Sequence, residues 1–284
     1  WLKTVAIWPQ AAGWYQAMSS GQKFPSGEDG DEHEQLIKNA WSAVFKSDKF
    51  EPPPLQGARM REKLRCHFVE ASVAELPEGD VLAAVDALLQ WELRRKSLVD
   101  STAFDRCTAD NRVALWRGDI TTLQIGAIVN AANERGLGCF QPSHRCIDNV
   151  IHCAAGPALR AACFEQLSTG FGGTLPTGHA MVTPGFNLPA DYVIHTPGPV
   201  GEHPAKLAQC YKSVLECCKT CGIRSVAFCC ISTGLFGYPA GPAAEVAVGT
   251  VRAWLDQGGA ADVDLVVFNT FLESDLRIYQ KLLC

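Results

Sequence analysis

The stretch "SVAFCCISTGLFGYPAGPAAEVAVGTVRAWLDQGG", residues 225–259, contains a short apolar run, a glycine-rich turn and a segment of helix length. The run "SVAFCCIS" has the composition of a buried strand. The segment from residue 240 onward ends at Gly258 and Gly259, residues that commonly terminate helices. A strand followed by a helix is the repeating unit of α/β proteins, so this stretch predicts that fold class.

The same pattern of short apolar runs and helix-length segments extends over the chain from about residue 111. Further short apolar runs predict five more buried strands: "VALWRGDI", "AIVNAAN", "AMVTPG", "YVIHTPG" and "DLVVFNT". Residues 205–222 predict a second helix, ended by Gly222. This alternation predicts a largely parallel sheet covered by helices on both faces. Ligands of such sheets bind at the carboxyl ends of the strands, which here lead into "NAANERGLGC", "HTPGPVG" and "STGLFGYPAG".

The N-terminal part of the chain has a different pattern. Over residues 33–98 apolar residues recur at three- and four-residue spacing, and "EPPP" separates a first helix from a second, so a small helical module is predicted. Residues 1–32 are polar and rich in turn formers, which indicates a loosely held lead-in. We therefore divide the chain into a lead-in with a helical module, 1–110, and an α/β domain, 111–284.

Composition limits the classes of protein that remain. The 284 residues can bury a large core without disulfides, and a net charge of -5 gives no sign of a nucleic-acid surface. The sequence shows no apolar run near the roughly 20 residues that span a bilayer and no signal-peptide order at its start. Thirteen cysteines, scattered mostly through apolar segments, indicate buried free thiols in a reducing compartment. We expect a soluble, cytoplasmic monomer that contacts neither membrane nor nucleic acid.

The loop "STGLFGYPAG" is a candidate anion site. Gly234 and Gly237 permit a tight turn whose N–H groups face a helix start, an arrangement suited to a phosphate or diphosphate. A glycine-rich turn that only connects two elements is the alternative.

Three polar residues follow predicted strands and are candidate ligand contacts. Asp119 could accept a hydrogen bond from an exocyclic amine such as that of adenine, or it could cap the next helix. Asn130 and Asn133 could bind sugar hydroxyls, or they could form local turns. For His152 and His195 a structural role is the favoured interpretation.

The segment "GCFQPSHRC" contains a candidate metal site. Cys139, His144 and Cys146 have the spacing Cys-x4-His-x-Cys, and thiolates with imidazole are ligands that zinc prefers. Three clustered ligands without an obvious fourth favour a catalytic site with an open position. The alternative is two buried thiols near an unrelated histidine. A second cluster in "CCKTC", residues 217–221, finds no residues nearby to complete four ligands.

Several of these motifs together resemble a known family. "LWRGDIT", "AIVNAANERGLGCFQPSHRCIDNVIHCAAGPALRAAC", "TGHAMVTPGFNLPADYVIHTPGPV" and "ISTGLFGYP" resemble the zinc-dependent branch of the macrodomains from about Val113 to Lys281. The module at 33–98 is more loosely similar to the N-terminal extension of that branch. The resemblance implies a three-layer α/β/α macrodomain with a mixed, largely parallel sheet, preceded by a small helical module. It also implies that the chain binds ADP-ribose and removes mono-ADP-ribose from modified protein side chains, with Zn²⁺ as cofactor.

Carried over residue by residue, the resemblance implies a complete site. Asp119 would hold the adenine amine beside the backbone of Ile120, Asn133 would face the distal ribose, and Asp148 would act on that ribose or on a water. The diphosphate would be wrapped by Ser232, Thr233, Gly234, Leu235 and Phe236, and zinc would be held by Cys139, His144 and Cys146. We predict Asp148 and Asn133 as the catalytic pair, although Asp148 could instead orient His144.

Two functions of different classes fit this sequence. The first is a zinc-dependent hydrolase acting on mono-ADP-ribosylated protein, and the second is a non-catalytic reader of ADP-ribose with a structural zinc. A zinc nucleobase deaminase is disfavoured because neither a His-x-Glu nor a Pro-Cys-x-x-Cys signature is present.

Overall fold

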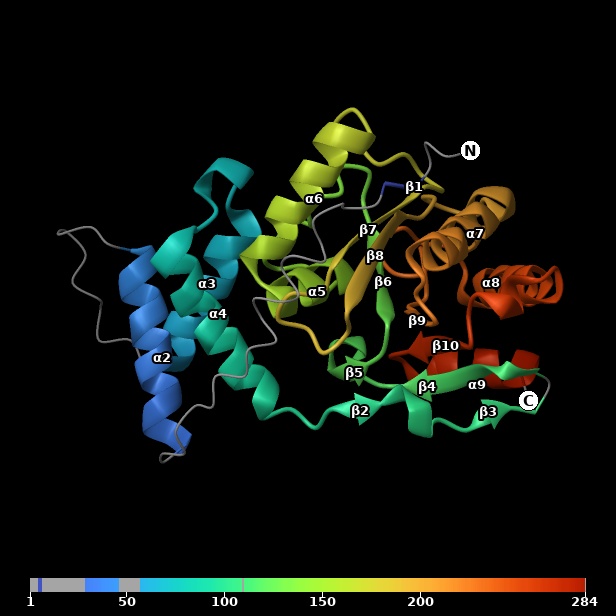
Figure 1. Ribbon diagram of the computed structural model, residues 1–284, viewed down its shortest axis with the longest axis horizontal. Coiled ribbons are helices and arrows are strands. Elements are labelled where there is room, and N and C mark those ends of the chain that lie inside the picture. The colour runs from blue at the N-terminus through green and yellow to red at the C-terminus, as the bar shows by residue number, and fades with distance from the viewer. Residues whose placement is uncertain (1–4, 7–28, 46–56, 109, 284) are drawn as a thin grey trace.

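The computed structural model describes residues 5–6, 29–45, 57–108 and 110–283, and an eight-stranded sheet forms their centre (Figure 1). The strand order is β1-β7-β8-β6-β9-β10-β4-β3. The strand bounds, in that order, are Val5–Ala6, Ala180–Pro184, Tyr192–Pro197, Ala127–Ala132, Ser225–Phe228, Leu265–Thr270, Asp110–Arg117 and Arg106–Cys107. A separate pair joins β2 (Val99–Asp100) to β5 (Leu123–Gln124).

The sheet is mixed but largely parallel, as the sequence predicts. The central strands β8, β6, β9, β10 and β4 run parallel to one another, whereas β7 pairs antiparallel with β8 and β3 pairs antiparallel with β4. All six residues of β10 are buried, which is typical of a strand covered on both faces. The carboxyl ends of the parallel strands therefore meet at one edge.

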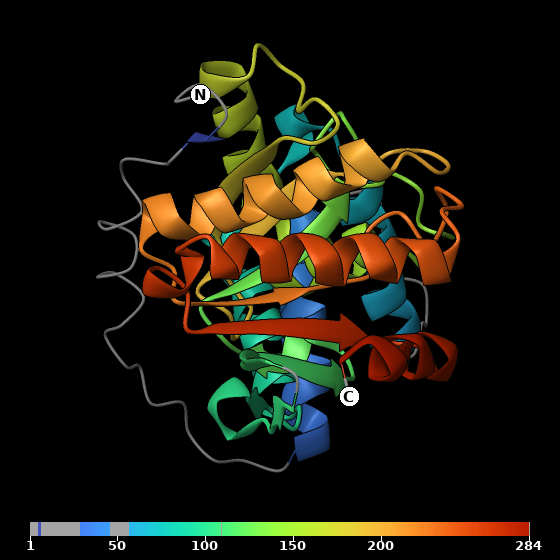
Figure 2. The same cartoon turned by 90° about the vertical axis from the view of Figure 1, so that its right-hand side faces the viewer.

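Helices cover both faces of the sheet and complete three layers. Figure 1 shows α5 (Ile147–Ala155) and α6 (Pro157–Gly170) on the left of the sheet and α7 (Pro204–Cys221) and α8 (Ala240–Asp256) on the right. Helix α9 (Glu273–Leu283) packs on α8, β4 and β10. In the view turned by 90°, α7 and α8 lie side by side across one face (Figure 2). Helix α7 ends where Gly222 adopts φ 69°, a left-handed conformation that glycine takes without strain.

The helical module is confirmed, with α2 (Asp29–Val44), α3 (Gly57–Glu70) and α4 (Gly79–Arg94). It has a hydrophobic core of its own, and α3 packs against α5 of the α/β domain. The predicted boundary at 110/111 is wrong in one respect, because β1 and β3 precede it and are strands of the main sheet. Most of the predicted lead-in, 1–32, lies outside the described residues.

A buried arginine fastens the module to the α/β domain. Arg160, on α6, is 3% exposed and donates to the carbonyls of Phe68, Val69 and Ala71 at the end of α3. Its Nε also donates to Leu137 O at 2.8 Å, and its guanidinium lies over the Phe140 ring. One side chain thus joins the end of α3 to the loop that precedes α5.

Replacing Arg160 by methionine will strongly destabilise the protein. The variant leaves several buried carbonyls without their donor, so we expect a loss of about 3 kcal/mol in the free energy of unfolding, measured by urea denaturation. The control is Arg135→Met, because Arg135 is exposed and lies over the same Phe140 ring at 5.2 Å. Equal destabilisation by both substitutions would contradict this role of Arg160.

Thiols in the described residues fit the predicted pattern of free cysteines. Those buried in the domain core include Cys163, Cys210, Cys217, Cys218 and Cys229, all unpaired as disulfides. Among the helices that the structure describes, none combines the length and the apolar character needed to cross a membrane.

Candidate functional site

A cleft of about 1350 Å³ opens at the carboxyl ends of the parallel strands. Its walls come from the loops after β4, β6, β8, β9 and β10, from the first turns of α5, and from α3 and α4 of the module. Every predicted site residue except Asn130 lines this cleft: Asp119, Ile120, Asn133, Cys139, His144, Cys146, Asp148, Ser232, Thr233, Gly234, Leu235 and Phe236. The fold therefore brings together residues that are up to 117 positions apart, from Asp119 to Phe236.

Asp148 is a buried carboxylate in the wall of this cleft. It lies in the first turn of α5 and is 4% exposed, and burial raises its pKa to about 6. Asn130 Nδ2 donates to Asp148 Oδ1 at 2.7 Å, which partly offsets the desolvation. No hydrogen bond between Asp148 and His144 is found in the described residues, so the alternative that Asp148 orients His144 gains no support.

Asn133 lies between Asp148 and the loop that contains Cys139. Its Nδ2 donates to Gly138 O at 3.0 Å and lies 3.5 Å from Asp148 Oδ2, while its Oδ1 accepts from the backbone N–H of Arg135. The Asn133 side chain thus stabilises a local turn, which was the alternative to sugar binding in the sequence analysis, and it also lines the cleft.

The prediction that Asn130 contacts the sugar is corrected by the structure. Asn130 has no exposed surface, because its position on β6 directs the amide beneath the cleft floor. There it contacts Asp148 and His195 Nδ1. Asn130 therefore supports the site from below.

The loop with the predicted metal ligands is fixed by Asn149, which the sequence analysis did not single out. Asn149 Nδ2 donates to Gln141 O at 2.7 Å and to His144 O at 2.8 Å. Cys139 Sγ lies 3.2 Å from His144 Nδ1. Burial raises the pKa of the Cys146 thiol to about 11, and the neighbouring Cys139 adds to this rise.

The three predicted ligand atoms are less compact than in a closed metal site. Among the described residues the group whose potential ligand atoms all lie within 4.8 Å of one another is His152, Cys163 and His195 instead. Two thiols and an imidazole on one short loop nevertheless have the donor chemistry that zinc takes. The loop residues thus fit a zinc ion by chemistry, and closing on it requires adjustment of the side chains.

Asp119, which also lines the cleft, caps a short 3-10 helix, Ile120–Thr122. Its Oδ1 accepts from the backbone N–H of Thr121 at 3.0 Å and from the Thr121 hydroxyl at 2.7 Å. Its Oδ2 lies 3.9 Å from Lys96 Nζ. The capping interpretation is therefore confirmed for Oδ1, and Oδ2 retains acceptor capacity toward a ligand.

The glycine-rich loop after β9 has a strained residue at its start. Ser232 adopts φ 67°, a left-handed conformation that costs a non-glycine residue about 1 kcal/mol or more. Its Oγ is buried and has no hydrogen-bond partner in the part of the chain that is described. Strain and an unpaired polar atom together are typical of a binding site.

Comparison with known proteins agrees with this geometry. Residues 129–247 match the family model "Macro domain". A "Protein-ADP-ribose hydrolase" of Staphylococcus aureus (strain MSSA476) is 43% identical over 213 residues, which cover 72% of this chain and 79% of that protein. The chain belongs to the Macro domain family.

Two further comparisons place this macrodomain among its relatives. The chain is 45% identical over 239 residues to a "Probable bifunctional ADP-ribose hydrolase/ADP-ribosyltransferase" of Fusarium oxysporum f. sp. cubense, covering 77% of the chain but 40% of that longer protein. The crystal structure of a Trypanosoma brucei macrodomain in complex with ADP-ribose matches with a TM-score of 0.59 and 30% identity, over 92% of this chain and 100% of that one. The predicted α/β/α macrodomain fold is thereby confirmed.

Two walls of the macrodomain cleft were not predicted from the sequence. The module contributes Arg61, Glu62, Arg65, Leu89, Glu92, Leu93 and Lys96 to the lining. Arg65 Nη2 donates to Pro142 O at 3.0 Å and so touches the loop with the predicted metal ligands. Phe271 and Leu272, which follow β10, also line the cleft and are 73% and 57% exposed. The sequence signal for this second wall was the apolar pair "FL" directly after the predicted strand "DLVVFNT".

Proposed function

We propose that this macrodomain is a zinc-dependent protein-ADP-ribose hydrolase that removes mono-ADP-ribose from modified protein side chains. The observation that carries the proposal is Asp148, a buried carboxylate of raised pKa in the wall of a large cleft. A reader needs contacts to the nucleotide, whereas a carboxylate held partly desolvated is suited to general-base catalysis. The names of the Staphylococcus aureus and Fusarium oxysporum relatives support the same class of reaction.

The two ends of ADP-ribose have matching partners in the cleft. Asp119 Oδ2 would accept from the adenine amine beside the backbone of Ile120. The loop from Ser232 to Phe236 would hold the diphosphate, because its residues precede the start of α8 and the Ser232 hydroxyl is available as a donor. The distal ribose would then lie near Asn133 and Asp148.

The chemistry proposed for the chain's own residues is hydrolysis at the anomeric carbon of the distal ribose. A water adds to that carbon, the bond from it to the acceptor side chain breaks, and the water's proton passes to Asp148. The departing side chain takes up a proton from solvent, and Asp148 returns its proton to solvent, so the step balances. A pKa near 6 leaves Asp148 largely ionised at neutral pH yet more basic than an ordinary carboxylate. Asn133 would fix the ribose against Asp148.

Cys139, His144 and Cys146 are the residues that would hold zinc. Bound there, the ion would supply Lewis-acid polarisation of a ribose hydroxyl or of the departing group. The alternative function, an ADP-ribose reader with a structural zinc, uses the same adenine and diphosphate contacts but needs no base.

The test is release of labelled ADP-ribose from a mono-ADP-ribosylated protein, with and without a chelator. We expect release that stops on chelation and returns with zinc. Binding of free ADP-ribose with no release under any condition would establish the reader instead.

Adding one methyl group at Gly198 tests whether the loop from Ser232 to Phe236 binds ADP-ribose. A Cβ on Gly198, after β8, would overlap Ser232 Oγ and Ile231, so Gly198→Ala must displace Ser232. We expect the affinity for free ADP-ribose to fall roughly thirtyfold, about 2 kcal/mol, by calorimetry. The control is Gly249→Ala on α8, where the added Cβ meets open space. Unchanged affinity in Gly198→Ala would separate this loop from binding.

A further inference from the structure

A row of buried polar side chains leads from Asp148 into the core of the sheet. Asn130 Nδ2 lies 2.7 Å from Asp148 Oδ1 and 3.1 Å from His195 Nδ1, and His195 Nε2 lies 2.9 Å from Thr183 Oγ1. All four residues are 4% exposed or less. The hydrogen bonds that link neighbouring members of the row reduce the cost of burying polar side chains in an apolar sheet.

Strand register places these side chains together. Asn130 on β6 is the direct partner of His195 on β8, so their side chains project from the same face. On the antiparallel strand β7, Met181 pairs with His195, and Thr183 is two residues further along on the same face. The arrangement of Asn130, His195 and Thr183 is therefore determined by the sheet, and Asp148 joins it from the first turn of α5.

The hydrogen bonds of the row have one consistent direction. A carboxylate only accepts, so the Asn130 nitrogen must face Asp148, and the same nitrogen then donates to His195 Nδ1. Burial lowers the pKa of His195 to about 3, so the ring is neutral and its proton lies on Nε2. That proton is donated to Thr183 Oγ1, and the Thr183 hydroxyl is 3.5 Å from Val193 O.

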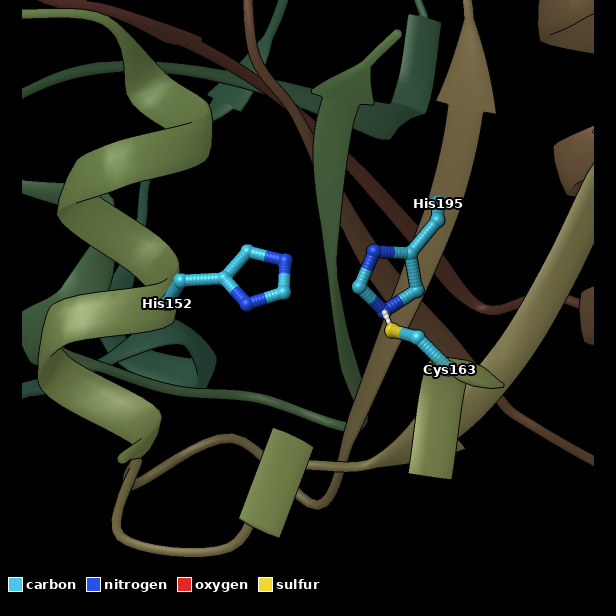
Figure 3. Close-up of side chains that lie close together, drawn as sticks. All are labelled: His152, Cys163 and His195. Atoms are coloured by element: carbon cyan, nitrogen blue, oxygen red, sulfur yellow. Dashed lines mark hydrogen bonds between the residues drawn. The ribbon is translucent and has the colours of Figure 1, made fainter. Parts of the chain in front are cut away.

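A metal site at the same place is the competing explanation. His152, Cys163 and His195 offer zinc-type ligand atoms within 4.8 Å of one another, and Figure 3 shows the two rings facing each other with Cys163 beside His195. Both ring nitrogens of His195 are already hydrogen-bonded, Nδ1 to Asn130 and Nε2 to Thr183. Cys163 Sγ also lies 3.6 Å from His195 Nε2. Metal binding would break this row, so the hydrogen-bonded row is the better account of the cluster.

We propose that His195 is a positioning residue for Asp148, acting through Asn130. The acceptor at His195 Nδ1 holds the second N–H of the Asn130 amide, while the first fixes Asp148 Oδ1 and leaves Oδ2 toward Asn133 and the cleft. Asn130 Oδ1 has no partner among the described residues, so the nitrogen alone anchors this amide. This positioning role rests on the proposed function in one respect, which is that Asp148 acts in hydrolysis.

The experiment compares His195→Asn with His195→Gln. Asparagine can return an acceptor oxygen to the place of Nδ1, whereas glutamine extends toward Thr183 and leaves Asn130 without an acceptor. We expect His195→Gln to lower kcat about thirtyfold with the affinity for free ADP-ribose changed less than threefold. His195→Asn should recover most of the loss. In an Asn130→Ala background, His195→Gln should cause no further loss of kcat.

A merely structural role predicts a different result. Both variants remove the same ring, so kcat would fall alike in both and follow the melting temperature, and the effects of His195→Gln and Asn130→Ala would multiply. Either outcome overturns the proposal.

A readout independent of turnover separates this proposal from the proposed function. The side-chain amide of Asn130 should show slow hydrogen exchange by NMR in the unmodified chain and in His195→Asn, and fast exchange in His195→Gln. If the unmodified chain releases no ADP-ribose but the amide behaves in this way, the proposed function fails and the positioning role stands. If His195→Gln leaves the exchange of the Asn130 amide unchanged, the positioning role fails.

Discussion

Replacing Asp148 by asparagine will greatly slow the release of ADP-ribose while leaving the protein able to bind it. Asparagine has the shape of the carboxylate and can still accept the hydrogen bond from Asn130, but it cannot take a proton from water. General-base catalysis contributes about 10²- to 10⁴-fold, so kcat should fall by that factor. Single-turnover release from a mono-ADP-ribosylated protein measures the loss, and calorimetry with free ADP-ribose should show a change below about threefold.

The matched control for this substitution is Asp86→Asn. Asp86 also accepts a hydrogen bond from an asparagine at 2.7 Å, here Asn187, and burial also raises its pKa. It does not belong to the lining of the cleft as described. We expect Asp86→Asn to retain release within a factor of three. A comparable loss in both variants would mean that Asp148 supports the fold and does not act on the substrate.

The sheet and its covering helices were predictable because their signals are local. A run such as "DLVVFNT", buried over its whole length, and a helix ended by Gly222 each depend on a few neighbouring residues. The antiparallel direction of β7 relative to β8 was not predictable in this way, since an apolar run carries no sign of the direction of its partner.

The sequence could not predict which polar side chains of the site are buried. Asn130 and Asn133 are three residues apart in one motif, and the pattern offers the same roles for both. Strand register places Asn130 against His195, 65 positions away, and leaves Asn133 at the cleft. The module's share of the cleft is likewise a tertiary contact, made by residues such as Arg65 across 77 positions of sequence.

Under the proposed zinc-dependent function, replacing Cys139 by serine will abolish zinc binding and turnover without unfolding the protein. The hydroxyl of serine is a poor zinc ligand, and the remaining pair, His144 and Cys146, is too few to retain the ion. We expect zinc content, measured by atomic absorption, to fall from near one equivalent to near zero, and release of ADP-ribose to fall about 10²-fold or more. The melting temperature should move by only a few degrees, because the large core of the sheet does not depend on this loop.

A matched thiol lies close by and tests whether the loss is specific. Cys66 Sγ on α3 lies 3.7 Å from Arg65 Nη2, and the same nitrogen donates to Pro142 O of the loop with the predicted metal ligands. Cys66→Ser therefore alters a nearby thiol without changing a predicted ligand. This variant should keep both zinc and turnover. If Cys139→Ser instead unfolds the chain, zinc has a structural role and the reader is favoured. If it keeps full activity after exhaustive chelation, the carboxylate of Asp148 acts without a metal. The two substitutions together therefore distinguish an ion that stabilises the loop from one that takes part in cleavage.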